Sequence, residues 1–283
     1  MHYDHVRPRN DNLPAPRDMT TSTLHDDDLT APSNPTPSAL RDDDLPAPCD
    51  TPLSGLRSTN MPALCDEPSG YGDGCADFYD QIYAPPPRMA IARLAALAGS
   101  GPVLEAGIGT GRYALPLAAA GVAMHGIDAS PAMLAALAAK PGGAAIPVTL
   151  GDFATMRVPG RFRLITCLAD TLSLLADATA QASALSHFAA ALHSDGQVLI
   201  ETAACPTTES TDTHIDIALT TATGTRRYAA RRCGVSVTAL DGWAAAAGLT
   251  LHERWRDWRG SPWNGEAGSV FSLYQRNDVH RYR

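Results

Sequence analysis

The sequence lacks a long apolar run, a secretory signal and a closely spaced cysteine pair. No hydrophobic stretch approaches the ~20 residues of a membrane helix, so we expect no membrane partner. The first ten residues hold no apolar core, and we therefore expect no secretory leader. The six cysteines show no C-x-x-C spacing, and burial explains the thiols that fall in predicted strands and helices. These absences favour a reducing, cytoplasmic setting.

Net charge is confined to one end of the chain. Residues 1–75 hold thirteen acidic and five basic residues, whereas residues 76–283 hold seventeen of each. The first segment is also rich in Pro, Asp, Ser and Thr, a composition that cannot bury a core. We therefore predict a disordered acidic tail over residues 1–75 and a folded domain over residues 76–283. Because that domain has no excess of positive charge, nucleic acid is disfavoured as a partner.

The tail repeats with a period of 16 residues. Asp11-Asn-Leu-Pro-Ala-Pro is followed by similar segments that begin at Asp27, Asp43 and Thr59. Each unit has too few apolar residues and too many prolines to stack into a solenoid, so we interpret it as disordered with polyproline-like stretches. A tandem duplication without a selected role explains the repeat, and a docking or regulatory arm is the alternative.

One stretch of the domain combines a strand, a glycine-rich turn and the start of a helix. The apolar pair Val103-Leu104 leads into Glu105-Ala-Gly-Ile-Gly-Thr-Gly-Arg. Glycines at such a turn permit a tight bend and a close approach of the backbone to a ligand. The register is an acidic residue followed by G-x-G-x-G, and Arg112 fills the third glycine position of a dinucleotide fingerprint. This spacing disfavours a nicotinamide dinucleotide.

Two more carboxylates follow the next two predicted strands. Asp128 closes an apolar run that begins at Val122, and Gly151-Asp-Phe follows a run that ends at Leu150. A carboxylate at position 128 can accept hydrogen bonds from both hydroxyls of a ribose. Turns and helix caps are the alternative role for these glycines and carboxylates.

In order and spacing, these three segments resemble the motifs of class I S-adenosylmethionine-dependent methyltransferases. The resemblance extends over residues 76–201 and implies S-adenosyl-L-methionine as the cofactor. It implies that Asp128 holds the ribose, while Asp152 and Phe153 meet the adenine amine and ring. The cofactor residues that it assigns are Tyr79, Tyr83, Glu105, Gly107, Gly109, Gly111, Asp128, Ala129, Met133, Gly151, Asp152, Phe153 and Leu168, with none assigned to a metal.

The tyrosines belong to the segment Ala76-Asp-Phe-Tyr-Asp-Gln-Ile-Tyr-Ala, where we expect order to begin. Similar Tyr-Asp-x-x-Tyr segments in small-molecule methyltransferases fold over the cofactor, so Tyr79 or Tyr83 is a candidate donor to the cofactor carboxylate. Packing alone explains these aromatic residues equally well.

The rest of the domain alternates between predicted strands and helices. We predict helices over 88–98, 112–119, 178–192 and 238–247, with another that starts after Ser130. We predict strands that end at 105, 128 and 150 and strands over 162–168, 197–201, 249–258 and 269–275, with possible strands over 214–221 and 226–233 and a turn at Asp195-Gly196. Such alternation favours a doubly wound sheet. With the resemblance, the expected fold class is α/β, a Rossmann-like seven-stranded methyltransferase sheet.

Methyl transfer from a sulfonium is an in-line displacement in which alignment supplies much of the acceleration, and it needs no covalent protein nucleophile. In an open α/β sheet the reacting end lies beyond the carboxyl ends of the strands, which selects Ala169-Asp-Thr after the central strand. We predict that Asp170 orients an amine or accepts its proton, and a turn cap is the alternative. His187 is the second catalytic candidate, although a lone helical histidine is more often packed or solvated.

The C-terminal residues bear on the substrate. Trp255, Trp258 and Trp263 are candidates for the wall of an apolar pocket, and arginines at 226–227 and 231–232 form a basic cluster for an acidic substrate or the tail. The closing pattern resembles actinobacterial-type enzymes that methylate secondary metabolites or ribosomal peptides. The segment between the fifth strand and the last helix is shorter here than in those enzymes.

Three functions are therefore compatible with the sequence. The first is an N- or O-methyltransferase acting on a small-molecule natural product or a modified peptide. The second is a binding module that retains the cofactor fold without catalysis. The third is a nucleotide-dependent oxidoreductase, which the glycine register disfavours. The residues predict neither the acceptor atom nor the oligomeric state.

Overall fold

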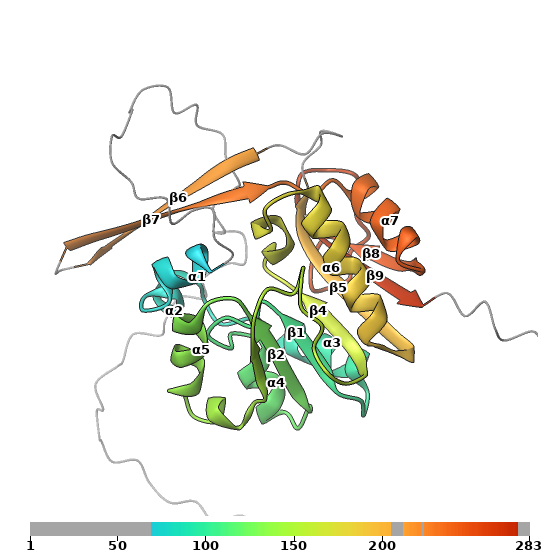
Figure 1. Cartoon of the computed structure of the whole chain (residues 1–283), viewed down its shortest axis with the longest axis horizontal. Helices are drawn as coiled ribbons and strands as arrows, with labels where there is room; N and C mark the ends of the chain where they lie inside the picture. Colours follow the sequence, from blue (N-terminus) through green and yellow to red (C-terminus); the bar gives the residue numbers. More distant parts are fainter. Residues whose placement is uncertain (1–68, 205–211, 222–223, 277–283) are drawn as a thin grey trace, which may run out of the picture. The chain divides into compact units, whose positions relative to one another are not determined.

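A computed structural model describes residues 69–204, 212–221 and 224–276 (Figure 1). All of them belong to one compact unit. The repeats lie outside the described residues, so the disorder of the tail stays a prediction. The boundary at residue 76 also stays a prediction, and the described chain carries one helix ahead of it, α1 (Gly70–Cys75).

A seven-stranded mixed sheet forms the centre of the unit. Its order is β3-β2-β1-β4-β5-β9-β8, in which β1 to β5 run parallel and β9 runs antiparallel to both of its neighbours. The strands are β1 (Val103–Ala106), β2 (Met124–Asp128), β3 (Val148–Leu150), β4 (Phe162–Cys167), β5 (Leu192–Ala204), β8 (Leu249–Trp255) and β9 (Gly268–Arg276). This topology confirms the predicted Rossmann-like methyltransferase sheet.

Helices cover both faces of the sheet, because alternate residues of a strand point to opposite sides. On β1, Val103 packs in a core with α3 (Arg88–Ala98) and α4 (Ala114–Ala119). Leu104 packs in a second core with α6 (Ala178–Ala191) and α7 (Val237–Ala246) (Figure 1). Burial on both faces is typical of parallel strands and explains their continuous apolar runs. No helix in the described ranges has the length and apolarity needed to cross a membrane.

Local capping sets where the helices begin. The Ser130 hydroxyl accepts a hydrogen bond from the Met133 backbone N–H at 3.1 Å, and Pro131 occupies the first turn of α5 (Pro131–Ala138), as predicted. Asp177 caps α6 in the same way, with 2.9 Å between its Oδ1 and the Ala180 nitrogen. The remaining short helices are α2 (Tyr79–Ile82), η1 (Gly143–Ala145) and η2 (Thr171–Leu174).

The predicted turn at Asp195-Gly196 is wrong, since both residues belong to β5. Leu192 pairs with Phe162, and the next pair along the ladder joins Gln197 to Leu164, so the residues between them bulge out. A Cβ at position 196 would lie 2.8 Å from the Phe162 carbonyl oxygen. The glycine therefore permits a close strand contact here, not a chain reversal.

The segment between β5 and α7 forms a separate hairpin of β6 (Asp212–Thr221) and β7 (Gly224–Cys233), which confirms the two possible strands. A two-stranded hairpin has little stability of its own, so its contacts with the body matter. Tyr228 of β7 packs in a third apolar cluster with Cys75, Phe78 and Met133. The hairpin thus lies against α1 and extends away from the sheet (Figure 1).

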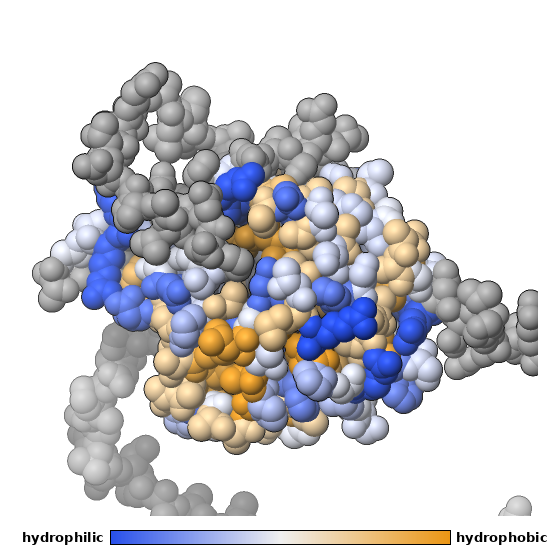
Figure 2. All heavy atoms as spheres, in the orientation of Figure 1, coloured by the Kyte–Doolittle hydropathy of each residue, from blue (hydrophilic) through white to orange (hydrophobic). Residues whose placement is uncertain are grey.

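The visible surface mixes polar and apolar residues (Figure 2). Apolar residues gather on this face near α5 and the adjacent sheet edge (Figure 2). At that edge, β3 exposes Val148 and Leu150.

Candidate functional site

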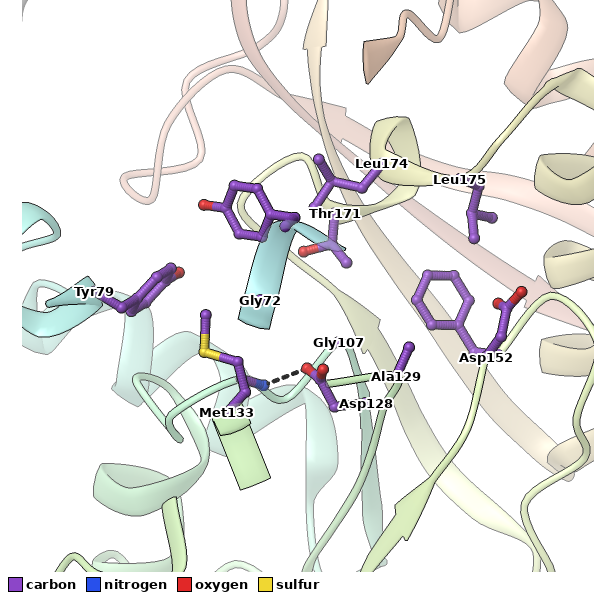
Figure 3. Close-up of a pocket in the computed structure, with 13 residues that line it drawn as sticks. Gly72, Tyr79, Gly107, Asp128, Ala129, Met133, Asp152, Thr171, Leu174 and Leu175 are labelled. Carbon is purple, nitrogen blue, oxygen red and sulfur yellow. Dashed lines mark hydrogen bonds between the residues drawn. The ribbon is translucent and has the colours of Figure 1, made fainter. Parts of the chain in front are cut away.

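A pocket opens at the carboxyl edge of the parallel strands. This is the place where an open α/β sheet binds its ligands. Its wall comes from α1, α2, the loop after β1, the β2–α5 connection, the loop after β3, and η2. The lining residues are Tyr71, Gly72, Tyr79, Gly107, Gly109, Asp128, Ala129, Met133, Asp152, Phe153, Thr171, Leu174 and Leu175 (Figure 3).

Asp128 is fixed at the end of β2 by two backbone donors. The Gly109 N–H donates to Oδ2 at 2.8 Å, the dashed contact in Figure 3, and the Ser130 N–H donates to Oδ1 at 2.9 Å. Burial raises the pKa of this carboxyl, and the two backbone donors oppose the rise. A carboxylate oxygen can accept more than one hydrogen bond, so Asp128 can still accept from two ligand hydroxyls.

The glycines of the loop after β1 have different roles. Gly107 has a φ of +74°, and a Cβ there would lie 2.4 Å from Cγ2 of Thr171. At Gly109, the nearest atom to an added Cβ would be Sδ of Met133 at 3.9 Å, so this part of the backbone faces open space. Gly111 does not line the pocket, because a Cβ there would meet Leu137 at 2.5 Å.

Glu105 lies behind the lining residues, at the end of β1, and is only 4% exposed. Its Oε2 has no hydrogen-bond partner among the described residues. Burial raises the pKa of Glu105 to about 8; the Asp128 carboxylate adds to this rise, and the Arg112 guanidinium opposes it. A buried oxygen without a partner is costly, and a cationic group of a ligand would satisfy it.

The loop after β3 supplies a polar and an aromatic group to the same pocket. The Ala154 backbone N–H donates to Asp152 Oδ1 at 2.8 Å and fixes that side chain. The Phe153 ring packs against Phe188 of α6, with 5.8 Å between the ring centroids. Because β2 and β3 are paired neighbours, Asp128 and Asp152 project from the same sheet edge.

Three tyrosine hydroxyls meet beside the pocket. The Tyr71 Oη lies 3.1 Å from the Tyr83 Oη and 3.5 Å from the Tyr228 Oη, and the last two are 3.4 Å apart. Burial raises the pKa of Tyr71, so this phenol is neutral at physiological pH. Tyr79 lines the pocket, whereas Tyr83 contributes its hydroxyl to the cluster outside the lining.

The turn after β4 is strained. Ala169 and Asp170 have φ values of +53° and +58°, and within the described ranges they alone combine a side chain with a positive φ. Each such residue costs on the order of 1–3 kcal/mol unless its surroundings hold it. Part of the restraint is a hydrogen bond of 2.8 Å from the Ala169 N–H to Oε2 of Glu201.

The Asp170 carboxylate adds further restraint. Its Oδ1 accepts from the Ala203 N–H at 3.0 Å, and its Oδ2 accepts from the Ser173 hydroxyl at 2.7 Å. Arg232 of β7 forms an ion pair with the same Oδ2. Asp170 does not line the pocket, but the next residue, Thr171, does. The predicted catalytic role of Asp170 stays a prediction, and the contacts described are those of a restrained turn.

His187 lies on α6 outside the pocket. Its Nδ1 is 3.2 Å from the Phe153 carbonyl oxygen, and its side chain lines a second cavity together with Arg157, Arg161 and Arg276. The structure therefore does not bring the two predicted catalytic residues together in the pocket. The predicted tryptophans lie elsewhere as well: Trp255 is stacked on Phe271 in the core, with the ring centroids 6.2 Å apart.

Most of the predicted cofactor residues do meet. Those that line the pocket are Tyr79, Gly107, Gly109, Asp128, Ala129, Met133, Asp152 and Phe153, and those outside the lining are Tyr83, Glu105, Gly111, Gly151 and Leu168. Sequence reasoning missed Tyr71, Gly72, Leu174 and Leu175, whereas it selected Thr171 as part of the segment after the central strand. Tyr71 and Gly72 fall in the segment assigned to the tail. The end of the Pro-Ala repeat at Leu64 was the signal in the sequence that could have placed these two residues outside the tail.

Comparison with known proteins gives one family and many similar structures. Residues 103–196 match the family model of the methyltransferase domain. No curated protein sequence matches the chain. The structure of the CcbJ methyltransferase from Streptomyces caelestis is 27% identical, with 75% of this chain and 98% of that chain covered and a TM-score of 0.65.

Two further structures share the fold at lower identity. CalS10, an amino pentose methyltransferase from Micromonospora echinaspora involved in calicheamicin biosynthesis, is 18% identical, with coverage of 71% and 95% and a TM-score of 0.54. The glycopeptide N-methyltransferase MtfA, complexed with S-adenosyl-L-methionine, is also 18% identical, with coverage of 71% and 90% and a TM-score of 0.54.

Proposed function

We propose, from the premise that this chain carries a methyltransferase domain of the S-adenosylmethionine-dependent class, that it methylates a nitrogen or oxygen of a natural product or a modified peptide. One observation carries the proposal. Asp128, Asp152 and the backbone of the glycine loop face one pocket at the carboxyl edge of the sheet. A nucleoside requires that combination of acceptors and close backbone approach.

The residues present fit S-adenosylmethionine. Asp128 would accept from the ribose hydroxyls, and Asp152 with Phe153 would meet the adenine amine and ring. The unpartnered Oε2 of Glu105 suits the cationic end of such a ligand, and the backbone at Gly109 faces open space, where a ligand can approach it closely. When bound, S-adenosylmethionine supplies a methyl carbon activated by its sulfonium. The contribution of the chain is to orient that ligand and to exclude water.

The acceptor class is supported by the outer wall and by the similar structures. Tyr71, Thr171 and Leu174 combine hydroxyl groups with apolar surface in the pocket that faces α1 and η2. This mixture suits a small or mid-sized organic acceptor. The similar proteins include enzymes named for a glycopeptide and for an amino pentose, both of which offer amines.

A second candidate function is cofactor binding without turnover. It is compatible with the state of Asp170, whose carboxylate is engaged by Arg232, Ser173 and Ala203 and lies outside the pocket lining. An enzyme that works by aligning its substrates needs no base here. The engaged carboxylate therefore disfavours acid–base catalysis by Asp170, but it does not distinguish an enzyme that works by alignment from a protein without activity.

The decisive experiment uses methyl-labelled S-adenosylmethionine. The full chain is incubated with the cofactor and a metabolite extract, and products are searched by mass for the gain of one labelled methyl. We expect such a product with wild type and less of it with Asp128→Ala at the same protein concentration and limiting cofactor. Saturable cofactor binding without any methylated product across extracts would support the binding module. Binding of NAD in preference to S-adenosylmethionine would support the oxidoreductase and overturn the proposal.

A further inference from the structure

The strained turn after β4 connects the cofactor pocket with the β6–β7 hairpin. Thr171 lines the pocket, and its Cγ2 occupies the space that a Cβ on Gly107 would need, so its position shapes the glycine loop. Immediately before it stand Ala169 and Asp170 in left-handed conformation. A non-glycine residue does not hold that conformation without restraint.

The hairpin supplies part of that restraint. Arg232 pairs with Asp170 Oδ2, and its Nε also donates to the Ser173 hydroxyl at 3.1 Å. The Ser173 hydroxyl in turn contacts Asp170 Oδ2 at 2.7 Å, so the guanidinium, the carboxylate and the hydroxyl form one network. The Arg232 and Asp170 side chains are 27% and 17% exposed, so bulk water screens their interaction less than at an open surface.

The same strand touches the opposite side of the pocket. Tyr228, four residues before Arg232, packs edge-on against Tyr71 of α1, with 5.5 Å between the ring centroids. Tyr71 lines the pocket, as Thr171 does. Residues 228–232 of β7 are therefore linked to both pocket residues. Tyr228 contacts Tyr71 directly, and Arg232 is linked to Thr171 through Asp170.

We propose that Arg232 is a positioning residue: through Asp170 it holds the strained turn after β4 and thereby places Thr171 against the glycine loop for cofactor binding. This inference rests on the proposed function for its binding readout. It assigns Asp170 to the same network, in place of a direct part in proton transfer. It also makes the hairpin a determinant of cofactor affinity, although none of its described residues lines the pocket.

The test is a calorimetric titration of the full chain with S-adenosylmethionine. Arg232→Gln should weaken binding about tenfold, because the turn loses a partly buried charge partner. Arg232→Lys keeps the charge but cannot reproduce both guanidinium contacts, so its affinity should lie between those of wild type and Arg232→Gln. The control is Arg227→Gln on the same strand, an exposed arginine whose loss should change affinity by less than about twofold.

Two double variants separate positioning from general damage. If Arg232 acts through Asp170, Asp170→Asn combined with Arg232→Gln should bind about as weakly as either single variant, not about a hundredfold more weakly than wild type. Ala169→Gly should restore most of the affinity of Arg232→Gln, because glycine adopts a φ near +53° without strain. Damage to folding would not be repaired in this way.

Amide hydrogen exchange over residues 168–175 provides a readout that needs no cofactor. Arg232→Gln should speed exchange there, and Arg227→Gln should leave it unchanged. Wild-type affinity and wild-type exchange in Arg232→Gln would overturn the inference. So would slower turnover of Asp170→Asn at unchanged cofactor affinity, the signature of a catalytic carboxylate. If wild type binds no S-adenosylmethionine, the proposed function fails, and the exchange data still decide the role of Arg232.

Discussion

The two sides of the pocket are held in different ways. On the β1–β2 side, Asp128 is fixed by backbone N–H groups only 19 and 2 residues away in sequence, those of Gly109 and Ser130. On the η2 side, the contacts join side chains far apart in sequence, such as Arg232 with Ser173 at a separation of 59 residues. The first side is built from local backbone geometry, and the second depends on where a distant hairpin packs.

The comparison leads to an expectation about the effects of mutation. Changes on the β1–β2 side should cause the largest losses of affinity, because a backbone that approaches a ligand closely has no alternative arrangement. Changes on the η2 side should weaken binding by a graded amount, because several contacts share the restraint.

The largest effect should come from Gly107→Val. Valine combines a strained positive φ with a Cβ that would lie 2.4 Å from Thr171. We expect S-adenosylmethionine affinity to fall by ~100-fold or more in calorimetry. Gly242→Val is the matched control, since a Cβ at that helical position meets nothing within 4 Å. Equal affinity in both variants would break the contrast between the two sides.

Asp128→Ala should weaken cofactor binding by ~1–3 kcal/mol, the value of lost charge-assisted hydrogen bonds. The variant also leaves the Gly109 and Ser130 N–H groups without their described acceptor. The exposed Asp195 is a suitable control, and Asp195→Ala should bind as wild type does. An Asp128→Ala protein that is folded, by its circular dichroism, and retains full affinity would remove this residue from the site.

Glu105 should make stability depend on pH. Its folded pKa of about 8 lies above the ordinary value because of burial, so the stability it contributes is complete below the ordinary pKa and is lost as pH rises toward 8. The Glu105→Gln side chain cannot ionise. We therefore expect the free energy of unfolding of this variant, measured relative to wild type in urea without ligand, to rise by ~2 kcal/mol or more as the pH is raised from 5 to 8. The same change at exposed Glu266 should alter nothing.

Tyr228→Phe tests how much the hairpin contributes to the pocket through the Tyr228 hydroxyl. It removes one hydroxyl from the three-tyrosine cluster but keeps the ring that packs on Tyr71 and Phe78. We expect a loss of ~1 kcal/mol or less in unfolding free energy, together with a small loss of cofactor affinity. A large loss of affinity would mean that the hydroxyl itself contacts the ligand.

Deletion of residues 1–68 should have the smallest effect. The repeats cannot bury a core, so melting temperature and cofactor affinity should match those of the full chain. Deletion of residues 1–75 should weaken binding, because it also removes Tyr71 and Gly72 from the pocket. Insolubility of the shorter deletion would instead indicate that the tail packs on the domain.

The sequence predicted the side that local chemistry builds. The Glu105-x-Gly-x-Gly-x-Gly register and the Ser130 cap each act within a few residues, and Asp128 stands at the end of an apolar run, so each has a recognisable pattern. The parallel strands were equally visible as apolar runs, because burial on both faces leaves no room for polar residues.

The other side could not be predicted from the same patterns. Nothing near Asp170 in sequence indicates that Arg232 will pair with it, since that contact depends on how the hairpin packs against η2. The two left-handed residues are an alanine and an aspartate, where local preference alone would favour glycine. Tyr71 was missed because the boundary of the tail was set from the composition of residues 1–75 as a whole, although the repeat ends before this residue.

The most direct test of the account is a crystal structure of the chain grown with S-adenosylhomocysteine, the product that methyl transfer would leave. The account predicts ribose hydroxyls within hydrogen-bonding distance of Asp128 and an adenine beside Asp152 and Phe153, with Thr171 in contact with the glycine loop. Density for the ligand in the cavity lined by His187 and Arg161, or an empty pocket at saturating ligand, would contradict it.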